Sequence, residues 1–159
     1  MASLIRHAVR PRFKSGLEEK IAKQIEDRGL DVIYERSRVY YMYPARRAEY
    51  RPDFILDNNI IIETKGIFDV ADRQKHLLLK KQVVGLDIRF VFQRDNRLYK
   101  GSPTRYSQWC EKFLFKYAVG EIPESWFKEP TGDRKHPHDL FPQSKPDPRT
   151  LRRRNPILI

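Results

Sequence analysis

The sequence predicts an α/β protein, with a mixed β-sheet flanked by helices around one core. The chain has 159 residues, of which 40% are hydrophobic, and this suits one domain with some tail left over. Segments with helical periodicity alternate with short runs of β-branched and aromatic residues, in the order helix, strands, helix, strand, strand, helix. That order is typical of a mixed sheet with helices packed against it.

Two helices have clear start and stop signals. Residues 15–29 begin with Ser15, a residue type that caps helices, and leucine or isoleucine recurs there at four-residue spacing on one face. Residues 69–85 begin with the capping residue Asp69, carry leucines on their buried side and end at a glycine. We expect His76, in the second helix, to be exposed to solvent.

The remaining elements are assigned from shorter patterns. Strands are predicted over residues 31–44, 54–56, 60–62, 86–93 and 98–101. Residues 45–51 follow Pro44, which disfavours a simple hairpin there, so we expect them to link two strands. Residues 102–120 carry aromatic residues at helical spacing and are predicted to form the last helix.

The charge of the chain restricts its function. The net charge is +11 and the isoelectric point is near 9.9, an excess that attracts polyanions and above all nucleic acid. No apolar run approaches the ~18 residues of a membrane span, so no membrane partner is expected. The N-terminus shows no secretory signal, and the single cysteine, Cys110, cannot form an internal disulfide, so a reducing compartment is expected.

The two ends of the chain differ from its middle in composition. Residues 1–14 are predicted to be a basic arm with little periodicity, and residues 15–130 to be the functional domain. Residues 131–159 combine five prolines with basic residues, a composition that favours a flexible tail over a packed element.

The stretch RPDFILDNNIIIETKG, residues 51–66, places three charged groups in an apolar hairpin. Asp53, Glu63 and Lys65 lie at or near its ends, where burial without partners is costly. A two-residue turn would point Asp53 and Glu63 to opposite faces, whereas a three-residue loop over residues 57–59 would set them opposite each other on one face. Both turns are compatible with the sequence. Strand alternation returns Lys65 to the face of Glu63.

Two interpretations of this hairpin remain open from the residues alone. The charges could form a salt bridge at the end of a sheet. Alternatively, Asp53 and Glu63 could hold a divalent cation, with Lys65 beside a reacting water or phosphate. The net charge of the chain favours the second interpretation. Glu18 has a structural interpretation, because Ser15 and Glu18 match the S-x-x-E pattern of a helix capping box.

A set of short motifs resembles a known family. The motifs, in order from Lys14 to Pro130, are SGLEEKIAKQ, YRPDFIL, IETKG, DRQKHLL, LDIRFVF, LYKGSPTRY, CEK and EIPESWFKEP. Together they resemble the phage endonuclease I family of junction-resolving enzymes, within the PD-(D/E)xK nuclease superfamily. The resemblance implies a restriction-endonuclease-like core. It covers most of the chain but not the first 13 residues or the tail.

The resemblance also implies which residues carry the chemistry. The catalytic carboxylates of the family fall on Glu18, Asp53 and Glu63, and the family's lysine falls on Lys65. One Mg²⁺ would be held by Asp53, Glu63 and the carbonyl of Thr64. A second would be held by Asp53 and Glu18, and Mn²⁺ is expected to substitute for either. This changes the interpretation of Glu18 from a helix cap to a metal ligand.

The same resemblance implies a substrate and an assembly. We expect a structure-selective endonuclease that resolves four-way (Holliday) and other branched DNA junctions, with Mg²⁺-dependent symmetric nicks from a homodimer. The dimer would exchange the strand region before Pro44 between protomers. Each active site would then take Glu18 from one chain and the other three residues from its partner. The expected location is the cytoplasm of an infected bacterial cell.

Basic residues outside the motifs are candidates for DNA contacts. Four are expected to bind backbone phosphates without reading base sequence: Arg12 and Lys14 in the arm, and Arg46 and Arg47 in the linker. Two other functions remain open. One is a PD-(D/E)xK nuclease of broader specificity, for DNA degradation or repair, and the other is a non-catalytic nucleic-acid-binding protein.

Overall fold

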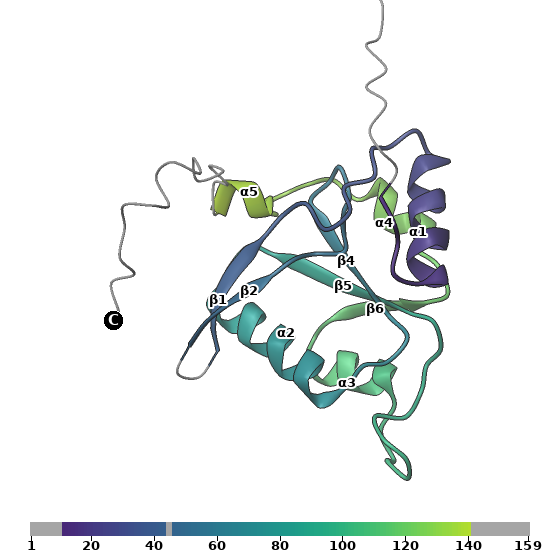
Figure 1. Ribbon diagram of the computed structural model, residues 1–159, viewed down its shortest axis with the longest axis vertical. Coiled ribbons are helices and arrows are strands. Elements are labelled where there is room, and N and C mark those ends of the chain that lie inside the picture. Colours follow the sequence, from purple (N-terminus) through teal and green to yellow (C-terminus); the bar gives the residue numbers. More distant parts are fainter. Residues whose placement is uncertain (1–10, 44–45, 141–159) are drawn as a thin grey trace, which may run out of the picture.

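The computed structural model describes residues 11–43 and 46–140. The elements in chain order are α1 (Gly16–Glu26), β1 (Val39–Tyr43), β2 (Arg46–Tyr50), β3 (Phe54–Ile55), β4 (Ile60–Lys65), α2 (Val70–Gln82), β5 (Asp87–Phe92), α3 (Tyr106–Lys112), β6 (Lys116–Val119), α4 (Glu124–Lys128) and α5 (Pro137–Leu140). In Figure 1, α1 and α4 lie on one side of the central strands, and α2 and α3 lie on the other. This confirms the predicted mixed α/β class with a sheet flanked by helices.

The main sheet has the strand order β3-β4-β5-β6. β3 pairs antiparallel with β4, whereas β4 with β5 and β5 with β6 are parallel pairs. Helices α2 and α3 lie in the two connections between the parallel strands. The carboxyl ends of β4, β5 and β6 therefore meet at one edge of the sheet, which is where ligands bind in many α/β proteins.

Two apolar clusters, one on each face, hold the helices to the sheet. The first joins α2 and α3 to the sheet through buried residues that include Ile61, Leu79, Phe90 and Trp109. The second joins α1 and α4 to the other face through buried residues that include Ile21, Ile62, Val91 and Trp126. Neighbouring residues of β4 enter different clusters because successive side chains of a strand point to opposite faces. Glu63, two residues after Ile61, therefore faces α2.

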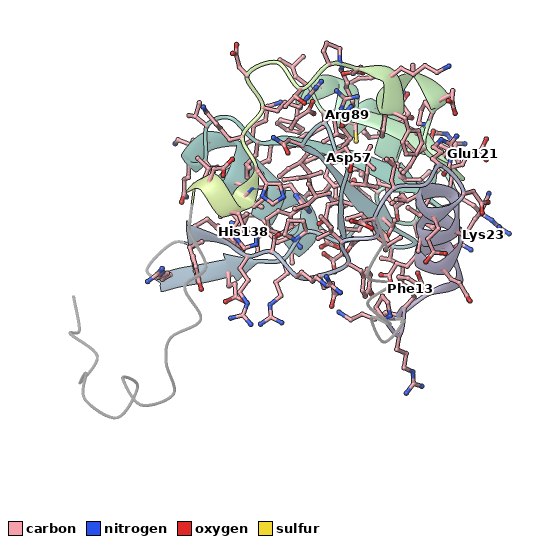
Figure 2. All side chains as sticks on the ribbon, turned by 90° about the horizontal axis from the view of Figure 1, so that it is seen from above. Phe13, Lys23, Asp57, Arg89, Glu121 and His138 are labelled. Atoms are coloured by element: carbon pink, nitrogen blue, oxygen red, sulfur yellow. The ribbon has the colours of Figure 1, made fainter. Side chains whose placement is uncertain are left out.

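The first two helices begin at the residues that the sequence predicts. The Ser15 hydroxyl accepts a hydrogen bond from the backbone N–H of Glu18 (3.2 Å), and the Asp69 carboxylate accepts one from the N–H of Asp72 (2.8 Å). Lys23 lies on the outer side of α1 (Figure 2), with most of its side chain exposed. Within the described ranges, the structure contains no helix with the length and hydrophobicity of a membrane span.

The prediction of a linker over residues 45–51 was wrong, because Arg46–Tyr50 form the strand β2. β1 and β2 pair antiparallel, with Val39 opposite Tyr50. Val39 and Tyr50 are buried and Ala48 packs beside them, in the same cluster as residues of α2. This packing against α2 stabilises a hairpin that Pro44 disfavours locally, because tertiary burial outweighs a local preference.

The prediction for residues 98–120 was wrong in two places. Residues 98–101 lie in a loop, and the predicted last helix ends at Lys112 instead of Gly120. Leu114 has a φ of +57°, a left-handed conformation that does not continue a helix. The next residues form β6, because pairing with the free edge of β5 satisfies their backbone groups.

Part of the predicted tail contacts the domain. In residues 131–140, Arg134 lies 2.6 Å from the carboxylate of Asp87, and Leu140 packs against the first apolar cluster. These residues therefore differ from the expected flexible tail. The rest of the predicted tail and the first ten residues of the predicted arm lie outside the residues that the structure describes.

A buried arginine joins β5 to the C-terminal segment. Arg89 lies in the interior (Figure 2) and is fully buried. Its guanidinium lies 2.7 Å from Asp87 and 2.6 Å from Glu129, and Arg134 contacts the same two carboxylates. Burial of this arginine is tolerated because both charges and hydrogen bonds are matched.

Candidate active site

β3 and β4 meet through a three-residue loop. The backbone N–H of Leu56 donates to the carbonyl of Ile60 (2.9 Å), which closes the loop in the register of the two strands. Asn59, the last residue of the loop, has a φ of +63°, the left-handed conformation that this loop type requires. Of the two turns compatible with the sequence, the structure has the one that sets Asp53 opposite Glu63.

Asp53 is held against the end of β4. Its Oδ2 atom accepts hydrogen bonds from the backbone N–H of Thr64 (2.8 Å) and from Thr64 Oγ1 (2.9 Å). The backbone carbonyl of Asp53 accepts a hydrogen bond from the N–H of Glu35 (3.1 Å). The bonds from Thr64 therefore hold the carboxylate of Asp53, and the bond from Glu35 holds its backbone.

Glu63 is almost completely buried, with 2% of its surface exposed. Its Oε2 atom lies 3.5 Å from Nζ of Lys65 and 3.6 Å from Nε2 of His76. Its Oε1 atom is buried and has no hydrogen-bond partner among the described residues. A buried carboxylate oxygen without a partner is energetically costly, so it marks a position where a ligand would stabilise the protein.

The two carboxylates affect each other's ionisation. Burial and the charge of Glu63 raise the pKa of Asp53 to about 7, against the hydrogen bonds from Thr64. Burial also disfavours the Glu63 carboxylate, but the neighbouring His76 and the ammonium of Lys65 lower its pKa below the usual range. Two acidic groups this close resist simultaneous ionisation. A bound cation would remove that repulsion.

Lys65 lies between two acids. Its Nζ atom is 3.0 Å from Oδ1 of Asp72 as well as 3.5 Å from Glu63, and Lys75 lies 3.3 Å from the same Asp72 oxygen. Burial opposes the charge of Lys65, but the carboxylates of Glu63 and Asp72 outweigh it and raise the pKa of the lysine. In the metal-free chain, Lys65 is therefore held as a protonated hydrogen-bond donor at neutral pH. Asp72 was not among the predicted site residues, because its only signal in the sequence is its place in the first turn of the next helix.

The expected exposure of His76 was wrong. Its side chain is fully buried, and neither ring nitrogen has a hydrogen-bond partner in the part of the chain that is described. The ring lies 5.5 Å from that of Tyr50 and 4.8 Å from that of Phe90, so the β1–β2 hairpin covers it. Burial lowers the pKa of His76, which makes the imidazole neutral at pH 7. Its three-residue spacing from buried Leu79 was the signal that could have placed it inside.

Glu18 lies on α1, where it stabilises the start of the helix. Its Oε2 atom accepts hydrogen bonds from the hydroxyl of Tyr34 (2.7 Å) and from the backbone N–H of Lys14 (2.6 Å). Among residues 11–43 and 46–140, no three His, Cys, Asp or Glu side chains are grouped to hold a metal. The single chain therefore does not bring Glu18 into one group with Asp53 and Glu63, and its metal-binding role stays a prediction.

Of the two residues of the N-terminal arm predicted to contact DNA, Lys14 is linked to the β3–β4 hairpin through Glu35. Arg12 and Lys14 are both exposed. The ammonium of Lys14 pairs with the carboxylate of Glu35, the residue whose N–H binds the carbonyl of Asp53. That hydrogen bond to Glu35 raises the pKa of Lys14, although slight burial opposes it. Lys14 is therefore joined to the candidate site through Glu35.

The other two predicted DNA contacts lie in β2, away from this edge of the sheet. The guanidinium of Arg47 is exposed and stacks over the ring of Tyr40 on β1, 4.2 Å from its centre. The backbone of Arg46 belongs to β2, and its side chain lies outside the described part of the structure.

The donor atoms of the hairpin fit a hard divalent cation. The carboxylates of Asp53 and Glu63 and the backbone carbonyl of Thr64 are oxygen donors, the type that Mg²⁺ and Mn²⁺ prefer. The unpartnered Oε1 of Glu63 and the raised pKa of Asp53 both indicate a position where a positive charge would be stabilising. Lys65 supplies a fixed ammonium beside these donors.

The sequence matches known phage nucleases over most of its length. A family model described as "Phage endonuclease I" matches residues 1–146. "Endonuclease I" of Escherichia phage T7 is 50% identical over 119 residues, which cover 74% of this chain and 80% of the relative. "Endodeoxyribonuclease 1" of Enterobacteria phage T3 is 47% identical over 134 residues, which cover 84% of this chain and 87% of the relative. Every residue of the candidate site lies within the range that the family model matches.

Proposed function

The chain belongs to the phage endonuclease I family, and from this premise we propose that it is a structure-selective DNA endonuclease. Its substrates would be four-way and other branched DNA junctions, cut by Mg²⁺-dependent phosphodiester hydrolysis in the cytoplasm of an infected bacterium. The observation that carries the proposal is the placement of Asp53 opposite Glu63, with Lys65 beside them. Such a group can bind a divalent cation and a phosphate side by side.

The oxygen donors of the hairpin would hold the metal. Asp53, Glu63 and the carbonyl of Thr64 would bind one Mg²⁺, and Asp53 with Glu18 would bind a second. The chemistry that Mg²⁺ supplies when bound is neutralisation of charge on the phosphate and a lower pKa for water. The buried, unpartnered Oε1 of Glu63 supports the first of these two positions.

The protein's own groups would orient the reacting phosphate. Lys65 is held as an ammonium by Glu63 and Asp72, so it donates hydrogen bonds to phosphate oxygens and carries positive charge where negative charge develops. The ring of His76 lies behind Glu63, with its Nε2 atom 3.6 Å from a carboxylate oxygen. Both groups are positioned before the substrate arrives, which lowers the cost of reaching the transition state.

A homodimer with exchanged strands belongs to the same proposal. In one chain, β1 pairs with β2, and α1 packs on the face of the sheet that carries Ile62. The same contacts would form between two copies if each chain extended between β1 and β2. Each site would then combine Glu18 of one copy with the other three residues of its partner. Two such sites suit a four-way junction, which offers two equivalent strands.

One assay separates this function from its two alternatives. The purified chain is incubated with a four-way junction and with a matched linear duplex, each with Mg²⁺ and with chelator. Symmetric, Mg²⁺-dependent nicks in the junction alone support the proposal. Equal cutting of both DNAs would indicate a nuclease of broader specificity. Binding without metal-dependent cutting, unchanged by Asp53→Ala, would indicate a DNA-binding protein without catalysis.

A further inference from the structure

The connection between β5 and α3 projects from the sheet edge that carries the candidate site (Figure 1). We call residues 94–105 the β5–α3 arm. Where the arm begins, the backbone N–H of Gln93 donates to the carbonyl of Lys65 (2.9 Å). Where it ends, the hydroxyl of Tyr106 accepts a hydrogen bond from the N–H of Phe68 (3.2 Å). Both ends of the arm are therefore attached to the segment that contains Lys65.

The β5–α3 arm has a defined internal structure. The backbone N–H of Leu98 donates to the carbonyl of Thr104 (3.0 Å), which joins its two sides. The N–H of Ser102 donates to the carbonyl of Tyr99 (3.0 Å), and this bond closes a turn at the tip. Gly101 has a φ of +84°, which a type II turn requires at its third residue. The side chains at the tip are thus presented on an ordered backbone.

Positive charge on the β5–α3 arm is not neutralised within the part of the chain that the structure describes. Its charged residues are one acid, Asp95, and four cations, Arg94, Arg97, Lys100 and Arg105. The Asp95 carboxylate accepts hydrogen bonds from the backbone N–H (2.9 Å) and hydroxyl (2.7 Å) of Ser107. Within the described residues, the side chains of Arg94 and Lys100 make no ion pair or hydrogen bond.

An exposed aromatic side chain lies beside these cations. Tyr99 precedes Lys100 at the tip of the arm, and 65% of its surface is exposed. Exposed rings next to unpaired cations are typical of surfaces that bind nucleic acid, because cations bind phosphates and rings pack on sugars or bases. An acidic protein partner would match the charge but would not explain the attachment of the arm to Lys65.

We propose that the β5–α3 arm binds the duplex next to the phosphate that is cut. Arg94 and Lys100 contact backbone phosphates there, and Tyr99 packs on a sugar. The choice of DNA as partner rests on the proposed nuclease function. The arm extends the positive surface of the active site along the substrate and sets the position of the DNA relative to Lys65.

A pair of charge-matched double variants tests this surface. Arg94→Gln/Lys100→Gln is compared with Lys81→Gln/Lys128→Gln, whose exposed lysines lie at the end of α2 and on α4. Affinity for a labelled four-way junction is measured with chelator from 50 to 200 mM salt. Each phosphate contact contributes about −0.9 to the slope of log affinity against log salt. Over this range the wild-type chain should therefore lose roughly 12-fold more affinity than the arm variant.

The control variant should keep the wild-type slope. In addition, Tyr99→Ala should weaken binding about fivefold or more, while Tyr99→Phe binds as wild type. Salt slopes and affinities of the arm variants equal to those of the control would overturn the proposal. Cutting is scored separately with Mg²⁺: a wild-type chain that binds the junction but never cuts it would contradict the nuclease function, and the slopes would still decide the role of the arm.

Discussion

The ammonium of Lys65 lies 3.0 Å from a carboxylate oxygen of Asp72, which the first turn of α2 brings to the end of β4. The same ammonium lies 3.5 Å from Glu63, so an acid from the strand and an acid from the helix hold it between them. A lysine placed in this way is fixed in position and stays charged. Asp72 is therefore expected to act through Lys65 and not as a metal ligand.

We expect Asp72→Asn to lower the cutting rate about 10- to 100-fold, the usual effect of removing a group that orients a catalytic residue. The single-turnover rate of junction cutting is measured over a range of Mg²⁺ concentrations. Junction affinity in chelator should not change. The control is Asp57→Asn, at the exposed residue of the β3–β4 loop. A rate for Asp72→Asn equal to that of the control would show that Lys65 does not need this partner.

Lys65→Ala should lower junction cutting by about 10³-fold or more, because the charge that stabilises the transition state is lost. Its junction affinity should remain nearly intact, since one lysine is a small part of the basic surface. The measurement pairs a cutting assay in Mg²⁺ with a binding assay in chelator. Lys75→Ala, which removes the other lysine beside Asp72, serves as the control. Normal cutting by Lys65→Ala would exclude a chemical role for Lys65.

Asp53→Asn should stabilise the metal-free protein above neutral pH. Burial and Glu63 raise the pKa of Asp53 from 3.8 to about 7, so its ionisation costs folding free energy that grows as the pH rises from 3.8 to about 7 and is constant above. We expect a gain of about 4 kcal/mol at pH 8 and almost none at pH 4. Thermal melting in chelator measures it. Lower stability of the variant at pH 8 would contradict the proposed repulsion.

Glu129→Gln should destabilise the fold at neutral pH by about 2–4 kcal/mol, because it leaves the buried Arg89 with one carboxylate fewer. The hydrogen bond from Arg89 lowers the pKa of Glu129 from 4.5 to about 2, against its burial. The carboxylate therefore contributes stability above pH 4.5, and this contribution is lost as the pH falls towards 2.

Denaturant unfolding of wild type and Glu129→Gln between pH 2 and pH 7 measures this effect. The difference in the free energy of unfolding should shrink as the pH falls through this window. Glu124→Gln, which removes an exposed acid paired with Arg28, should change stability little at any pH. A difference for Glu129→Gln that stays constant with pH would show that its ionisation is not coupled to folding.

Local features of the fold were predictable from sequence. Ser15 and Asp69 were recognised as helix caps because a cap bonds to a backbone N–H three residues away. The common face of Glu63 and Lys65 was equally predictable, because residues two apart in one strand point to the same side. Elements whose pairing partners lie far along the chain could not be predicted from sequence. Residues 116–119 follow aromatic residues at helical spacing. They form a strand only because they pair with the free edge of β5.

The residues of the candidate site also fall into two groups, those that the sequence predicts and those that depend on tertiary packing. Asp53, Glu63 and Lys65 could be singled out because charge inside an apolar hairpin is unusual, and the pairing of the two acids then depended on one choice between two loops. Asp72 could not be placed, since its position depends on how α2 lies against β4. The three-residue spacing of His76 from Leu79 indicated the buried side of the helix, but only the packing of the β1–β2 hairpin brings its ring under Tyr50.

The amino-acid sequence by itself determined the α/β class, the basic charge, the two capped helices and the chemical type of the site. Only the tertiary structure decided that Asn59 adopts the left-handed conformation that sets Asp53 opposite Glu63, and that α2 places Asp72 against Lys65. The physical reason is the separation along the chain over which each kind of interaction acts. Caps, charge and alternation act between residues a few positions apart, whereas a buried charge is stabilised by whichever groups the packing of distant segments brings within a few ångströms.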